Sequence, residues 1–169
     1  MKSSDAAPVG GAVCVPCVEA RMTRDSFTDQ EEAELESLEI MYVDLAGPVT
    51  PQSKGGANHV LTTKDGRTGL VVIGLLKAKS EAEAELRAIV NRQEKASGKE
   101  VKRIRCDGAG ELTNQAEMVA CYKEWEIKLE PTLPYTPESN GVAERLNRTL
   151  FERTRAVVLT AKVDKILWG

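Results

Sequence analysis

The sequence predicts an α/β domain with a mixed sheet, and three observations lead to this fold class. Three short, largely apolar runs (38–46, 58–63 and 69–76) follow one another with short links between them. The apolar period then changes to that of a helix. From there to the end of the chain, strand-like and helix-like segments alternate. We therefore expect an antiparallel meander of three strands that continues into strand–helix units.

Length and composition limit the classes of protein to which this chain can belong. The 169 residues are enough for one domain with a substantial core and a tail. The 41% hydrophobic and 29% charged residues are typical of soluble globular proteins. No apolar run reaches the roughly 20 residues of a membrane helix, and the N-terminus lacks a secretory signal. We expect an intracellular protein without membrane contact, whose four cysteines form no disulfide framework.

The net charge of −3 is unevenly distributed along the chain. Between Asp29 and Glu39 there are six acids and no base, so the rest of the chain carries a net charge of +3. From Val142 to Gly169 there are six bases against three acids. A modest basic face for a polyanion is therefore compatible with the acidic total. The acidic stretch itself fits either a polar linker or a short solvated helix.

The predicted strand over residues 38–46, ended by Gly47-Pro48, contains the acid Asp44 among apolar neighbours. An ionised carboxylate there costs several kcal/mol unless it is paired or binds a metal. The alternative is a carboxylate at a frayed strand end that reaches water. The runs 58–63 and 69–76 are the next two strands, and Asp65-Gly66 between them predicts a hairpin turn.

The middle of the chain alternates helix and strand. A capping box from Ser80 to Glu83 predicts the start of a helix that Gly98 ends, with an apolar stripe at Ala82, Leu86, Ile89 and Val90. A strand over 101–106 then delivers Asp107 at its carboxyl end, where sites gather in α/β sheets. After Gly108-Ala-Gly110 we predict a helix and a last short strand over 126–130; the helix bears Leu112, Ala116, Val119 and Tyr122.

A final helix is predicted after the breakers Pro134, Pro137 and Asn140-Gly141. Its expected packing face is the stripe of Val142, Leu146, Leu150, Val157 and Ala161. Glu144 would point away from this face, and Arg148 and Arg155 would share its side. Such a side suits a metal ligand beside a polyanion. It equally suits an ordinary solvated face with Glu/Arg pairs.

Two cysteines near the N-terminus have the spacing of half a zinc site. Cys14 and Cys17 form a CxxC pair, but tetrahedral zinc needs four ligands. Cys106 and Cys121 lack a second CxxC spacing, and the single histidine, His59, lies in a strand-like run. The pair is thus either a remnant of a zinc module or two idle thiols, and we expect no complete zinc site in this chain.

Asp44, Asp107 and Glu144 all stand at junctions between strands, loops and helices. Two Mg²⁺ ions bridged by such carboxylates can activate an attacking oxygen and stabilise the leaving oxygen of a phosphodiester. The segments around them resemble, in order, the catalytic core of retroviral-type integrases, and most of all that of copia-type LTR retrotransposons. The matching segments are Cys14-x-x-Cys17 with Arg21, Thr23, Arg24 and Phe27; 38–48; 77–81; Asp107-Gly-Ala-Gly-Glu-Leu112; and Pro134-Tyr-Thr-Pro-Glu-Ser-Asn-Gly-Val-Ala-Glu144-Arg-Leu-Asn-Arg-Thr149.

This resemblance implies a ribonuclease-H-like fold, with a five-stranded mixed sheet flanked by helices in residues 38–169. Residues 1–37 would be a disordered tail with the zinc remnant and the acidic linker. It also implies an Asp-Asp-Glu triad of Asp44, Asp107 and Glu144 that holds two Mg²⁺ or Mn²⁺ ions. The expected activity is DNA 3′-end processing and strand transfer by a homo-oligomer in the nucleus. The candidate DNA contacts are Tyr135, Asn140, Arg145, Arg148 and Arg155.

Three departures from the family pattern leave rival interpretations open. No histidine precedes Cys14, the usual asparagine after Asp107 is replaced by Gly108, and the chain stops at Gly169 where the family's core continues. We therefore expect a fragment of a larger Pol polyprotein. The alternative function is a catalytically inert remnant that at most binds nucleic acid. A ribonuclease or resolvase of the same fold would hydrolyse without strand transfer, and the segment from Asn140 to Glu144 argues against it.

Overall fold

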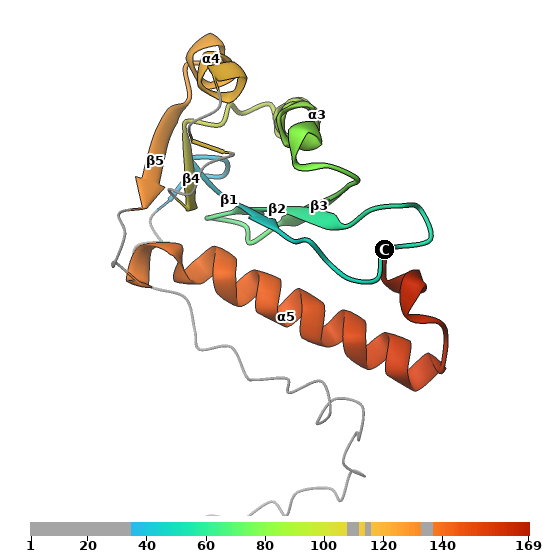
Figure 1. The fold of residues 1–169 in the computed structure, drawn as a ribbon. Helices are drawn as coiled ribbons and strands as arrows, with labels where there is room; N and C mark the ends of the chain where they lie inside the picture. The colour runs from blue at the N-terminus through green and yellow to red at the C-terminus, as the bar shows by residue number, and fades with distance from the viewer. Residues whose placement is uncertain (1–34, 108–111, 114–115, 133–136) are drawn as a thin grey trace, which may run out of the picture.

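The computed structural model describes residues 35–107, 112–113, 116–132 and 137–169 (Figure 1). Most of the predicted tail, including Cys14 and Cys17, lies outside the described residues. So do Tyr135 and the glycine-rich turn that follows Asp107. No helix in the described part of the chain is long and apolar enough to span a membrane.

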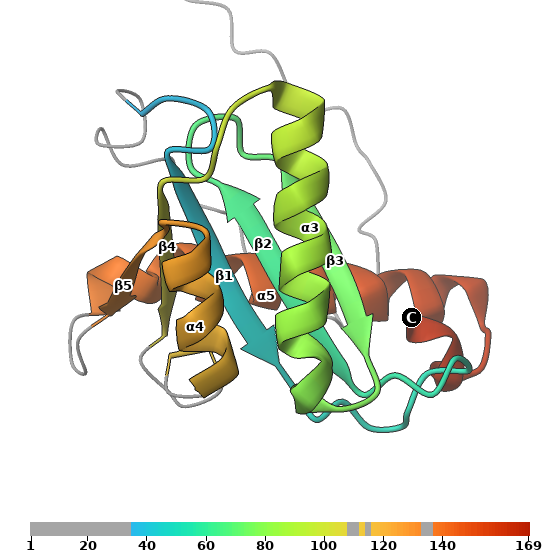
Figure 2. The ribbon, with the colours of Figure 1, turned by 90° about the horizontal axis from the view of Figure 1, so that it is seen from above.

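Five strands form one sheet in the order β3-β2-β1-β4-β5 (Figure 2). The first three pair antiparallel, as the predicted meander requires, while β4 is parallel to β1 and β5 is parallel to β4. The mixed five-stranded sheet is thereby confirmed. The strands are β1 (Ile40–Ala46), β2 (His59–Asp65), β3 (Val71–Leu76), β4 (Arg103–Asp107) and β5 (Lys128–Thr132).

Helices cover both faces of the sheet, as Figures 1 and 2 show. Helices α3 (Ala82–Ser97) and α4 (Ala116–Glu124) lie on one face, and the long helix α5 (Pro137–Ala161) crosses the other. Two short 3₁₀ segments, η1 (Lys79–Glu81) and η2 (Lys165–Trp168), precede α3 and follow α5. This three-layer arrangement is the predicted ribonuclease-H-like fold.

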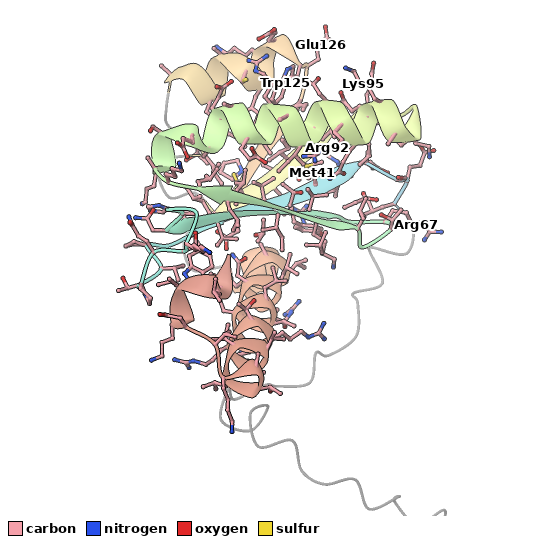
Figure 3. The ribbon with its side chains drawn as sticks, turned by 90° about the vertical axis from the view of Figure 1, so that its right-hand side faces the viewer. Met41, Arg67, Arg92, Lys95, Trp125 and Glu126 are labelled. Carbon is pink, nitrogen blue, oxygen red and sulfur yellow. The ribbon has the colours of Figure 1, made fainter. Side chains whose placement is uncertain are left out.

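The main core lies between the sheet and the α3/α4 layer. Met41, fully buried, projects from β1 toward α3 in Figure 3. Each such side chain contributes about 1.5–3 kcal/mol through burial. Alternate strand residues reach the core, so the residues between them face α5. The fully buried apolar side chains of this core include Met41, Val43, Leu61, Leu86, Ile89 and Ile104.

Helix α3 ends as predicted but begins differently. Gly98 adopts φ 68°, where glycine is favoured, and its amide donates to the Glu94 carbonyl. The predicted capping box from Ser80 to Glu83 is wrong. Glu81 accepts hydrogen bonds from the amides of residues 77 and 78 instead, at 2.8 and 3.4 Å. Glu83 is engaged elsewhere, because its carboxylate pairs with Arg87 at 3.1 Å.

Helix α5 corrects two predictions. It begins at Pro137, not after Gly141, because proline is well suited to the first position of a helix. Its predicted packing stripe is confirmed only in part. Val142, Leu146 and Leu150 are half-buried, whereas Val157 is 66% exposed and Ala161 is exposed. The fully buried residues Ala143 and Asn147 lie one position further along, and Thr154 and Val158 continue their side of the helix.

Helix α4 is shorter than predicted, and its predicted packing face is confirmed only in part, at Tyr122. Leu112 is buried but precedes the helix, and Ala116 is exposed at its start. Tyr122 and Met118 are buried as the contact to the core. The last strand, β5, begins two residues later than the predicted run.

Candidate active site

The pairing of β1 with β4 brings Asp44 and Asp107 together. The parallel register matches Tyr42 with Arg105 and Val43 with Cys106, so Asp44 and Asp107 are the next residues along the two strands. Val43 and Cys106 are buried in the core under α3 and α4. Because side chains alternate along a strand, the two carboxylates point to the opposite face, toward α5. The sequence-based expectation for Asp107, at the carboxyl end of its strand, is confirmed.

Asp44 is half-buried and held at both carboxylate oxygens. Its Oδ1 accepts from the Leu45 amide at 2.9 Å, and its Oδ2 accepts from Asn147 Nδ2 at 2.5 Å. Burial raises the pKa of Asp44 above its ordinary value, and the two hydrogen bonds oppose this shift. The negative charges of Asp107 and Glu144 raise the pKa further, so the site disfavours its own ionised form.

Within the described part of the chain, the two aspartates have no compensating positive charge paired with them. Among the described residues, no lysine or arginine forms an ion pair with Asp44 or Asp107. Two neighbouring carboxylates without a base are the hard oxygen donors that Mg²⁺ or Mn²⁺ prefers. The pair therefore fits a divalent cation, which would supply the missing charge.

Glu144 lies close to this pair without joining it in one ligand set. It is exposed on α5, one turn before Asn147, and its charge acts on Asp44. However, the part of the chain that the structure describes contains no group of three acidic, histidine or cysteine side chains that could hold a metal ion. The structure thus places Glu144 near the two aspartates, but the three carboxylates do not form one group that could hold a metal ion.

Sequence reasoning missed Asn147, the residue that joins α5 to Asp44. Asn147 is 6% exposed, and its Oδ1 has no hydrogen-bond partner within the described structure. A buried amide with one group unsatisfied carries a free-energy cost of about 1–3 kcal/mol. The signal was the spacing of Asn147 three residues after Glu144, which places the two on adjacent parts of one helix surface.

Four of the five predicted DNA contacts belong to the described residues, and they are spread along α5. Asn140 lies in the first turn of the helix, and Arg145 and Arg148 are exposed in the turns beside the carboxylates. The guanidinium of Arg145 lies against Gly141, where an added Cβ would be 3.0 Å from its Nη1. Arg155 lies farther along and lines an apolar groove. The structure therefore groups Arg145 and Arg148 with the acids and separates Arg155 from them.

Comparison of the sequence with known proteins finds relatives among Pol polyproteins. The chain is 33% identical over 156 residues to the retrovirus-related Pol polyprotein from transposon TNT 1-94 of Nicotiana tabacum. It is 29% identical over 106 residues to the Pro-Pol polyprotein of Feline foamy virus. These matches cover 92% and 63% of this chain but only 12% and 9% of the two polyproteins. No protein-family model matches the sequence.

A solved structure shares the fold. A chain in the cryo-EM structure of the simian T-cell lymphotropic virus intasome, in complex with the PP2A regulatory subunit B56 gamma, aligns with a TM-score of 0.59. The alignment covers 76% of this chain and 45% of that one at 20% identity, which supports the ribonuclease-H-like fold. The two sequence relatives place the chain among the Pol polyproteins of retrotransposons and retroviruses.

Proposed function

We propose that this domain is the catalytic core of a copia-type retrotransposon integrase, which processes DNA 3′ ends and transfers them to target DNA with the help of divalent metal ions. One observation carries this proposal. Asp44, two residues before the end of β1, and Asp107, at the end of β4, lie on adjacent parallel strands, with no basic partner among the described residues. Such a pair favours metal-dependent chemistry over a purely structural role.

The chain's own residues would divide the work as follows. Asp44 and Asp107 would hold a metal ion jointly, and Glu144 would complete a second site when DNA binds. Bound Mg²⁺ or Mn²⁺ would supply charge stabilisation for the attacking and leaving oxygens of the phosphodiester. The Asn147 amide and the Leu45 amide keep the Asp44 carboxylate oriented, which reduces the reorganisation needed when the cation binds.

DNA would approach along the exposed side of α5. Arg145 and Arg148 lie in the turns next to Glu144, where a phosphate backbone could release its counterions. Tyr135 and Asn140 would contact the strand near the reacting phosphate, and Arg155 would reach a more distant one. A homo-oligomer in the nucleus would present two such sites to the two DNA ends. Zinc is not part of this proposal.

Strand transfer with a labelled DNA end tests the proposal. Asp107→Asn should reduce Mg²⁺- or Mn²⁺-dependent joining by more than about a thousandfold, because removing a metal ligand removes the positioned charge. Glu100→Gln, which removes an exposed carboxylate before β4, is the matched control and should retain activity. Full joining by the Asp107 variant would refute the assignment.

A second candidate is an inert module that binds DNA without chemistry. The observation in its favour is that the described residues contain no closed group of three metal-ligating side chains. This candidate predicts salt-sensitive DNA binding with no joining and no cleavage by the native chain in either metal. Cleavage without joining would instead indicate a nuclease of the same fold.

A further inference from the structure

A large apolar groove lies on the α5 side of the sheet and begins at Asn147, the residue that donates to Asp44. It occupies about 950 Å³ between the β2–β3 edge, α5 and the C-terminal segment. Its walls are mostly aliphatic or aromatic, and the Trp168 indole, which donates to the Pro51 carbonyl at 2.7 Å, forms part of one wall. Its apolar lining includes Val60, Ile73, Leu75, Leu150, Val158 and Trp168.

The groove leaves large hydrophobic side chains in contact with solvent. Ile73, Leu75 and Leu159 line it and are 45%, 47% and 39% exposed. Val163 and Leu167, in the same C-terminal segment as the lining residue Trp168, are 43% and 47% exposed. A soluble monomer rarely exposes a large contiguous apolar patch, so such a surface marks an interaction site.

Three charged residues line the groove, and one of them, Glu152, is an acid that already interacts with another group. The other two are Arg155 and Lys165, and neither forms an ion pair within the described residues. Along α5, the lining runs from Asn147 to Leu159, a distance of about 18 Å at the helical rise, which matches a partner helix of about three turns. An apolar floor with basic margins is complementary to a helix with an apolar stripe and acidic flanks.

We propose that this groove is the docking site for an amphipathic helix with an apolar stripe and acidic flanking residues. The apolar side chains would enter between β3 and α5, as in other helix-in-groove complexes. The acidic flanks would pair with Arg155 and Lys165. This docking requires neither Asp44 nor Asp107, although Asn147 borders both sites, so failure of either proposal leaves the other intact.

The test uses the whole chain and a defined probe. A fluorescein-labelled peptide of about 18 residues carries leucines at i, i+3, i+4 and i+7 spacing and glutamates on its flanks. Fluorescence anisotropy should show binding at least about tenfold tighter than for a scrambled peptide of the same composition. Replacing its glutamates with lysines should weaken binding to the native chain.

Variants locate the binding to the groove. Leu75→Ser should weaken binding about tenfold or more, whereas Leu70→Ser should not, because Leu70 is 54% exposed on the same sheet edge but outside the groove. Lys165→Glu should weaken binding of the peptide with glutamate flanks and strengthen binding of the peptide with lysine flanks. Since all three side chains are exposed, thermal unfolding should show that the variants remain folded.

Three results would overturn the proposal. The first is equal binding of the patterned and scrambled peptides. The second is equal binding by the Leu75 and Leu70 variants. The third comes from sedimentation of the chain alone: a dimer that Leu75→Ser dissociates, and that the peptide cannot displace, would make a second copy the occupant. A monomer that binds the patterned peptide through Leu75 and Lys165 supports it.

Discussion

Two parts of the same face of β4 handle charge in opposite ways. Arg103 donates to Glu39 at 2.6 Å, and Arg105 donates to Glu130 at 3.1 Å, so each of these acids has a basic partner. Two residues beyond Arg105, Asp107 ends the strand beside Asp44, and neither has a basic partner among the described residues. The ion pairs of the first part stabilise the fold, whereas the second part keeps negative charge to which a cation can bind.

The carboxyl pKa values follow this contrast. Burial raises the pKa of Glu130, but hydrogen bonds to Arg105 and Lys128 and the charges of Arg105 and Arg103 outweigh it, so the pKa is lowered. Burial and two neighbouring acids raise the pKa of Asp44 despite its hydrogen bonds. Ionisation is therefore favoured at Glu130 on β5 and disfavoured at Asp44 on β1.

Of three variants that test the contrast between these two regions, the one that removes the amide that orients Asp44 should have the largest effect. Asn147→Ala should weaken Mn²⁺ binding about 10- to 100-fold, because Asp44 Oδ2 loses its donor and the carboxylate is no longer held. Isothermal titration measures the change. Asn91→Ala, an exposed position on α3, is the control. An unchanged affinity in the Asn147 variant would show that this amide has no part in metal binding.

A smaller effect, a loss of stability, is expected at Glu130, which pairs with Arg103 and Arg105. Glu130→Gln should lower the free energy of unfolding by about 1 kcal/mol at neutral pH, because Arg103 and Arg105 lose a partly buried partner. The folded-state pKa of Glu130 is lowered, so this stabilisation is present above the unfolded-state pKa and is lost as pH falls through the folded-state value. Urea unfolding across pH checks both points. A loss that persists in full at low pH would contradict this account.

The smallest effect, a gain of stability, is expected at Asp44 beside Asp107. Without metal, Asp44→Asn should stabilise the fold by at most about 1 kcal/mol at neutral pH, because it removes a negative charge that burial and, to a smaller extent, the charges of Asp107 and Glu144 disfavour. The folded-state pKa of Asp44 is raised, so protonation removes the same charge in the native chain. The advantage of the variant should therefore shrink as pH falls through that pKa. Thermal unfolding in EDTA measures it, and destabilisation at neutral pH would refute the idea.

The sequence alone was sufficient to predict the sheet and the positions of the two aspartates in their strands. Short apolar runs with tight links predict an antiparallel meander because few other arrangements bury them. Asp44 stood out as an acid within an apolar strand, and Asp107 as an acid at a strand end. Their adjacency depends only on the parallel pairing of β1 with β4, which the order of the segments allowed.

The helix details could not be predicted in the same way. Helix α5 carries leucines and valines on more than one side, so its apolar period does not define one packing face. Close approach to the sheet instead selects the small Ala143 and the hydrogen-bonding Asn147 for the inward side. Likewise, the role of Glu83 depends on Arg87 and on the Cys121 thiol, which donates to it at 2.9 Å from another helix. Such contacts are tertiary and leave little trace in local patterns.

The most direct test of the account is a Mn²⁺ titration of the native chain beside Asp107→Asn and Glu100→Gln. The unpaired aspartates should give saturable Mn²⁺ binding in the native chain and in the Glu100 control, with a loss of at least about tenfold in the Asp107 variant. Affinity should fall as the pH approaches the raised pKa of Asp44, because the proton competes with the ion. Equal binding by all three chains, or none by the native chain, would contradict the claim that this pair is a metal site.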